Sequence, residues 1–139
     1  SASRSANESP RPVTIAPVLR EIWEEMECCH RLFSQLARSG SRGYAPIQQA
    51  QRQQTGQLGA LICLLTGNPP TASNGTPPTG SRMQQLIWSL NTMERCATRL
   101  EEVSAQGAGM SRDTLKELAV QQRQLWSRCL ILLGSLVMA

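Results

Sequence analysis

Apolar residues recur at spacings of three and four in four separate stretches of the chain, with polar residues between them. This spacing places the apolar side chains on one face of an α-helix. The first stretch shows it in Leu19, Ile22, Met26, Cys29, Phe33 and Leu36. The pattern predicts four helices, at about residues 17–38, 45–66, 82–106 and 112–136, with Ser111 as the N-cap of the last.

The segments between these stretches carry residues that end helices. SGSRGY at 39–44 and GAG at 107–109 are short breaks, whereas residues 67–81 form a long Pro-rich connection. Residues 1–15 are rich in Ser, Pro and Arg, which predicts a disordered tail. We therefore expect an all-α protein with one domain, a four-helix bundle at 16–139.

The first and second pairs of predicted helices resemble each other. A shift of 67 residues brings Leu19, Met26 and Cys29 onto Leu86, Met93 and Cys96, and a shift of 71 brings Gln51 onto Gln122. This repeat predicts two helical hairpins related by a pseudo-two-fold axis. A helix of this length spans about 33 Å, and the connection at 67–81 could reach about 50 Å when extended. It can therefore cross the bundle from end to end.

Composition narrows the class of protein. The net charge is +4, but the arginines are spread over all the predicted helices without a dense basic stripe, which argues against a nucleic-acid surface. The five cysteines form no C-x-x-C pair and no even-numbered framework. Their number favours reduced thiols in a cytoplasm and disfavours the alternative of a small secreted signalling protein.

The C-terminal half of the last predicted helix is apolar on nearly all sides. Its sequence, LWSRCLILLGSLVMA, contains Arg128 as the only charge. The run Leu130–Ala139 is too short to cross a bilayer, so no membrane span is predicted. An apolar helix end needs a cover, and we expect a homodimer or a partner protein to contact it.

Two segments resemble helices of a known family. LREIWEEMECCHRLFSQLA is similar to the first helix of the ferritin-like superfamily, in particular of rubrerythrin-type bundles, and IQQAQRQQTGQLGALICLLTG is similar to the second. The resemblance covers about residues 17–136. It implies a bacterial, cytoplasmic ferritin-like bundle with the long crossover between its second and third helices. Members with a di-iron centre carry a Glu on the first and third helices and Glu-x-x-His on the other two.

The matching positions here lack those ligands. The inward mid-helix positions are occupied by Met26, Gln51, Gln54, Met93, Gln122 and Leu125. A slip of one residue would turn Glu27 and Glu94 inward on the first and third helices. The second and fourth helices would still lack Glu-x-x-His, and His30 is the only histidine. We therefore expect no catalytic residue, no cofactor and no enzyme activity, and we interpret the chain as a structural or interaction module.

Glutamine at these positions predicts a polar layer in an apolar core. Gln51, Gln54 and Gln122 can hydrogen-bond to one another where facing carboxylates would be too costly to bury. We expect this layer to be internally satisfied. The alternative is that the three side chains reach out to solvent.

A second interpretation is a soft-metal site for copper binding or storage. Thioether and thiolate ligands suit Cu(I), and the candidate ligands are Met26, Cys29, His30, Met93 and Cys96, with Cys129 nearby on the last predicted helix. The simpler explanation is that Met and Cys fill gaps in the core. The acidic run Glu24, Glu25 and Glu27 predicts a solvated helix face with ion pairs four residues apart.

Overall fold

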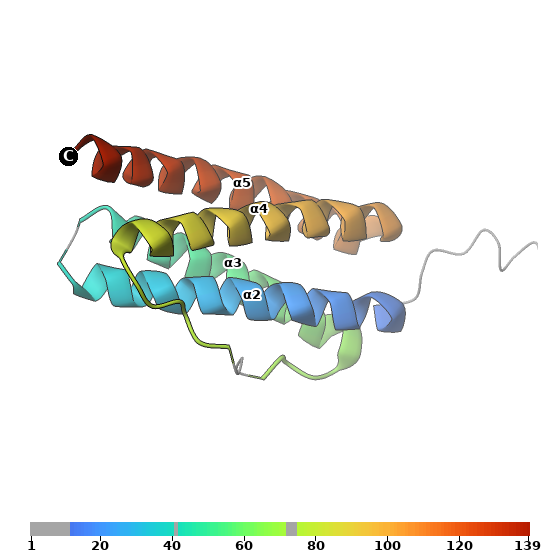
Figure 1. The fold of residues 1–139 in the computed structure, drawn as a ribbon. Coiled ribbons are helices and arrows are strands. Elements are labelled where there is room, and N and C mark those ends of the chain that lie inside the picture. The colour runs from blue at the N-terminus through green and yellow to red at the C-terminus, as the bar shows by residue number, and fades with distance from the viewer. Residues whose placement is uncertain (1–11, 41, 72–74) are drawn as a thin grey trace, which may run out of the picture.

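The computed structural model describes residues 12–40, 42–71 and 75–139, and these residues form an all-helical bundle. The helices are α2 (Pro12–Arg38), α3 (Tyr44–Thr66), α4 (Arg82–Gln106) and α5 (Gly109–Met138), and no strand occurs within these ranges (Figure 1). The predicted fold class, a bundle of four helices, is therefore confirmed. No helix in the described part of the chain is long and apolar enough to span a membrane.

Two helix starts differ from the prediction. α2 begins at Pro12 rather than at about 17, so residues 12–15 are helical and not part of a tail, and Pro17 lies inside the helix. Ile15 is buried and extends the apolar stripe of α2, and this packing outweighs the preference of proline for a first turn. Residues 1–11 of the predicted tail lie outside the described residues.

α5 also begins earlier than predicted. Its N-cap is Ala108, and Ser111, the predicted N-cap, lies inside the helix. Gly109 has a φ of 59° and makes the turn from α4 into α5 possible, because this backbone conformation is open to glycine at little cost. The helix then continues to Met138, beyond the predicted end at about 136.

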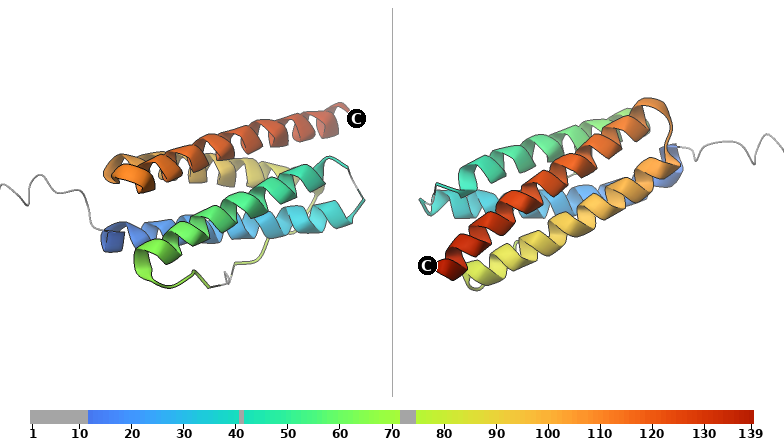
Figure 2. Two further views of the ribbon diagram at one scale, coloured as in Figure 1. Left: turned by 180° about the vertical axis from the view of Figure 1, so that it is seen from behind. Right: turned by 90° about the horizontal axis from the view of Figure 1, so that it is seen from above.

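The helices pack as two hairpins. α2 packs mainly against α3, and α4 mainly against α5, with smaller contacts between α2 and α4 and between α3 and α5. In Figures 1 and 2, α3 ends at one end of the bundle and α4 begins at the other, so α3 and α4 run in the same direction, and α2 runs opposite to α4. Hydrogen bonds help to attach the intervening connection to the helices: Arg31 donates to the carbonyl of Gly75, and Gln85 Nε2 donates to that of Pro78 at 3.0 Å.

Local signals fix the ends of this connection. α3 ends at Gly67, which adopts the left-handed conformation at φ 83° and donates its N–H to the Cys63 carbonyl. α4 begins with a capping box, in which the Ser81 side chain accepts from Gln84 N–H and the Gln84 side chain accepts from Ser81 N–H. These two caps determine where each hairpin stops and starts.

The apolar core consists of two clusters that follow one another along the bundle. The first includes Leu58 of α3 and Leu118 of α5, and the second includes Ile47 of α3 and Leu125 of α5. The buried residues between the clusters on these two helices are polar: Gln51, Gln54 and Thr55 of α3 and Gln122 of α5. The core is therefore divided near its middle by a polar layer.

Candidate functional site

The polar layer is a set of three buried amides that bond to one another. Gln122 Nε2 of α5 donates to Gln51 Oε1 at 2.8 Å and to Gln54 Oε1 at 2.6 Å, both on α3. Gln51 Nε2 in turn donates to the Met26 carbonyl of α2 at 3.5 Å. The glutamines thus face inward and not toward solvent, so the prediction of a polar layer is confirmed and its alternative is wrong.

One part of that prediction is wrong. Gln122 Oε1 is buried and has no hydrogen-bond partner among the described residues, so the layer is not fully satisfied. The Gln122 amide directs its nitrogen at the two acceptors on α3, and this orientation leaves its oxygen unpaired. A buried acceptor without a partner costs about 1–3 kcal/mol.

The remaining predicted ligand positions surround this layer with apolar groups. Met26 of α2, Met93 of α4 and Leu125 of α5 are all buried. Glu94 does not turn inward, because it is exposed and pairs with Arg123 at 3.6 Å, and Glu27 lines a surface cavity. The centre of the bundle therefore offers amide oxygens and thioethers, and neither of the two glutamates that a slip in register would supply.

Sulfur side chains lie in the core beside the amides. Cys29, Cys96 and Cys129 are fully buried, like Met26 and Met93. Burial, and then the neighbouring Cys96 and Cys129, raise the pKa of the Cys29 thiol well above its usual value. Burial likewise raises the pKa of Cys129, whose sulfur lies 3.1 Å from Ser89 Oγ. These thiols are neutral at physiological pH.

His30 does not join the sulfur side chains. Its Nε2 lies 3.2 Å from Gln48 Nε2 and 3.4 Å from Ser34 Oγ, at a half-buried position between α2 and α3. Burial lowers the pKa of its imidazole. Within the described ranges, no group of three or more His, Cys, Asp or Glu side chains is placed to hold a metal ion.

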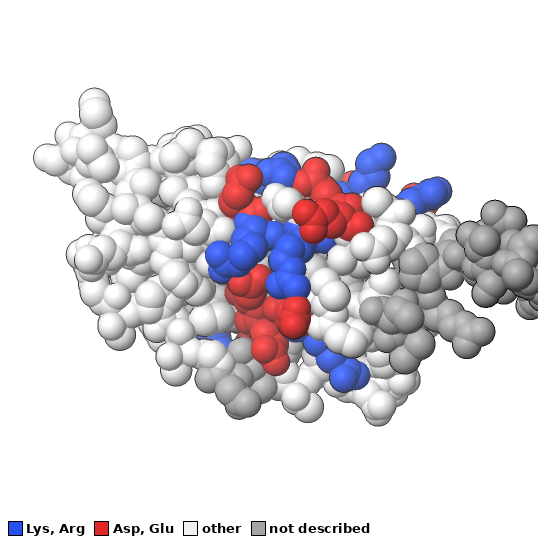
Figure 3. Space-filling view, turned by 45° about the vertical axis from the view of Figure 1, so that its right-hand side comes forward, with Lys and Arg blue, Asp and Glu red and all other residues white. Residues whose placement is uncertain are grey.

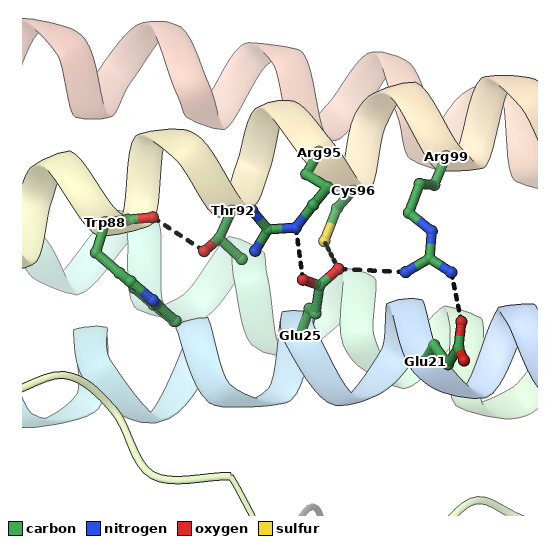
Figure 4. Close-up of polar contacts among 7 residues, drawn as sticks. All are labelled: Glu21, Glu25, Trp88, Thr92, Arg95, Cys96 and Arg99. Carbon is green, nitrogen blue, oxygen red and sulfur yellow. Dashed lines mark hydrogen bonds and ion pairs between the residues drawn. The ribbon is translucent and has the colours of Figure 1, made fainter.

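A band of ion pairs crosses α2, α4 and α5. Arg95 Nε lies 2.7 Å from Glu25 Oε1, and Arg99 bridges Glu21 at 2.5 Å and Glu25 at 3.6 Å (Figure 4). On the other side of α4, Arg123 of α5 contacts Glu94 and Glu101. Figure 3 shows the band as alternating acidic and basic side chains across the middle of the molecule.

The band corrects one prediction and explains a pKa. Glu25 pairs with α4 rather than with a residue four positions away on its own helix. Its Oε2 also lies 3.8 Å from the Cys96 sulfur, and burial together with this carboxylate raises the pKa of the Cys96 thiol. Because the pairs are partly exposed, each contributes little stability by itself. Their main effect is to set the register of α2 against α4.

A cavity of about 600 Å³ opens on the outer side of the α2–α3 hairpin. Its lining includes Trp23, Glu27 and His30 of α2, Arg52, Gly56 and Gly59 of α3, and Pro69 and Pro70 of the connection. The sequence reasoning missed this cavity. Two glycines inside a predicted helix were the available signal, because glycine in a helix interior is costly.

Comparisons with known proteins assign this chain to no family. The chain matches no family model, no curated protein and no solved structure. The resemblance to ferritin-like bundles therefore stays a prediction.

Replacing Gln122 with leucine tests the polar layer. Gln122→Leu leaves the Gln51 and Gln54 oxygens without their donor, so we expect the free energy of unfolding to fall by about 1–3 kcal/mol. The triple replacement of Gln51, Gln54 and Gln122 by leucine removes all the buried amides. It should cost less than the sum of the three single changes in urea unfolding. Additive losses would contradict the hydrogen-bonded trio.

Thiol reactivity tests the burial of the sulfur cluster. Cys63 is partly exposed, whereas the other four cysteines are buried, and burial raises the pKa of each of those four. With an aromatic disulfide reagent at pH 8, we expect one fast thiol in the native protein and five after unfolding. Cys63→Ser should abolish the fast phase. Several fast thiols in that variant would show that the core is open.

Proposed function

We propose that this chain is a metal-free, non-enzymatic relative of ferritin-like bundles that acts as a protein-interaction module. The observation that carries the proposal is the amide trio at the centre of the bundle, where Gln122 donates to both Gln51 and Gln54. In this proposal the two hairpins are related by a pseudo-two-fold axis, and residues 67–81 are the long crossover of the superfamily.

The chemistry of the trio supports the loss of a di-metal centre. Two cations a few ångströms apart need several carboxylates and an imidazole each, and such carboxylates are too costly to bury once the metal is gone. Glutamine has nearly the same shape as glutamate and is neutral, so it can stay buried if it finds a partner. Gln51 and Gln122 occupy equivalent positions in the sequence repeat, and Gln122 Nε2 donates to Gln51 Oε1 at 2.8 Å.

The interaction surface in this proposal is the C-terminal part of α5. Four of its apolar side chains are exposed: Leu130 at 44%, Ile131 at 69%, Val137 at 63% and Met138 at 86%. Residues 129–139 carry no charged side chain, and the face of this end of the molecule that Figure 3 draws shows none. Met83 and Ile87 at the start of α4, at the same end of the bundle, are exposed as well.

A second copy of the chain is the partner that fits this surface. A two-fold interface sets one patch against itself, so a charged patch would meet like charges across the axis. An uncharged patch has no such penalty and loses apolar surface to water on pairing. We therefore propose a homodimer through the end of α5, in a reducing cytoplasm that keeps the five thiols free.

The alternative function is soft-metal storage. Met26, Cys29, Met93 and Cys96 are all fully buried, and sulfur ligands of this type suit Cu(I). Binding would have to deprotonate thiols whose pKa burial raises, so the affinity should rise with pH.

Metal loading separates the two functions. We expect the purified protein to contain no stoichiometric metal after anaerobic incubation with Fe(II) or with Cu(I), measured by elemental analysis after desalting. Two irons per chain would overturn the metal-free proposal. One or more copper ions that Cys29→Ser and Cys96→Ser abolish would establish the alternative.

A charge at the end of α5 tests the dimer. Ile131→Glu places a carboxylate in the proposed apolar interface, so sedimentation should change from dimer to monomer at equal protein concentration. Leu64→Glu is the matched control, because Leu64 is 72% exposed on α3. This control should remain a dimer. A monomeric wild-type protein at high concentration, or a dimeric Ile131→Glu variant, would contradict the interface.

A further inference from the structure

The cavity on the α2–α3 hairpin is created by residues that weaken the helix they belong to. Gly56 and Gly59 lie inside α3, and neither has the positive φ that would require glycine. Each costs about 1 kcal/mol relative to alanine in a helix interior. Backbone geometry requires glycine at neither position, and what the two glycines change is the space above them.

The two glycines keep that space open in different ways. A Cβ on Gly59 would lie 3.3 Å from Trp23 Nε1 and 3.6 Å from Pro70 Cγ, so Gly59 allows both rings to approach α3. A Cβ on Gly56 would have nothing within 4 Å. Gly56 therefore leaves an open floor, and the indole of Trp23 with Pro69 and Pro70 forms an apolar wall beside it.

The other end of the cavity carries one charge of each sign. Glu27 of α2 and Arg52 of α3 both line it, and in the described part of the chain neither makes an ion pair or a hydrogen bond. Arg52 is moreover the only charged residue of α3. Both lie near His30, since the charge of each shifts the His30 pKa.

His30 itself adds no charge to the cavity near neutral pH. Burial is the largest cause of its lowered pKa, Glu27 opposes the shift, and Arg52 and Arg31 reinforce it. Gln48 Nε2 donates toward its Nε2, which suits a neutral ring. The charged groups that a ligand meets in the cavity are therefore Glu27 and Arg52.

We propose that this cavity binds a small zwitterion with a flat apolar group, the chemistry of a free aromatic amino acid. The ring lies over Gly56 against Trp23 and Pro70, the ammonium group faces Glu27, and the carboxylate faces Arg52. A ligand with a single charge would meet a like charge at one of these two residues. A volume of about 600 Å³ accommodates such a ligand, within the usual range of small-molecule sites.

The binding site is independent of the proposed interaction surface. All the residues that line the cavity belong to α2, α3 and the connection after α3. Loss of the dimer or binding of a metal would therefore leave this proposal standing.

The test uses the indole N–H of Trp23 as a reporter. L-phenylalanine is titrated into ¹⁵N-labelled protein, and the Trp23 signal is identified among the three indole signals by its loss in Trp23→Phe. We expect a saturable shift of the Trp23 signal and of the Gly56 and Gly59 amides, with the Trp88 and Trp126 indoles unmoved. No shift of the Trp23 signal up to the solubility limit would overturn the proposal.

Two truncated ligands test the zwitterion. 2-Phenylethylamine lacks the carboxylate and 3-phenylpropionate lacks the amine, and each should bind at least tenfold more weakly than phenylalanine. Arg52→Gln should remove the difference between phenylalanine and 2-phenylethylamine. Glu27→Gln should remove the difference between phenylalanine and 3-phenylpropionate. Equal binding of all three ligands to the wild-type protein would overturn the assignment of the charges.

Gly56→Ala separates the role of the cavity from that of the helix. The added methyl group should stabilise α3 and raise the melting temperature, while it fills the floor and weakens phenylalanine binding at least tenfold. Gln49→Ala, at an exposed position of α3 outside the cavity, is the control and should bind like the wild type. Unchanged binding in Gly56→Ala would overturn the proposed position of the ring.

Discussion

Three polar side chains buried in the middle of an apolar core constrain the whole bundle. Gln122 of α5 has two acceptors on α3, at 2.8 and 2.6 Å, and no water-exposed alternative. A slide of α5 along α3 by a single turn would leave three amides unpaired in a low-dielectric interior, which costs far more than a shifted apolar contact. The trio therefore sets the register that the apolar stripes alone leave loose.

The outer surface sets the register of the other helix pair by a different means. α2 and α4 are joined by Arg95 and Arg99, which reach Glu25 and Glu21, and Arg123 extends the band to α5. Solvent screens these pairs, so they contribute specificity more than stability. α3 takes no part in the band. Its one charged residue, Arg52, makes no ion pair with any described residue.

The sequence was sufficient for the features that depend on helical periodicity. Four helices and an inward position for Gln51, Gln54 and Gln122 follow from spacing alone, because the side chains on one helix face must share one environment. Features that depend on distant partners were missed. Ile15 extends α2 through its burial in the bundle. Glu25 forms ion pairs with arginines on α4 that lie far away in the sequence. The cavity was missed for the same reason, since Pro69 and Pro70 form a wall only when the connection packs against the α2–α3 hairpin.

α3 differs from its neighbours in every one of these respects. It supplies two of the three buried amides on one side and the two glycines of the cavity on the other. Two glycines weaken α3, and no ion pair among the described residues joins it to another helix. The contact between α3 and α5 is also the smallest of the contacts between packed helices. Its position therefore depends on apolar packing against α2 and on the hydrogen bonds from Gln122. A ligand above Gly56 would contact α3, the most weakly packed helix of the bundle. Ligand binding should therefore stabilise the position of α3 and with it the amide layer.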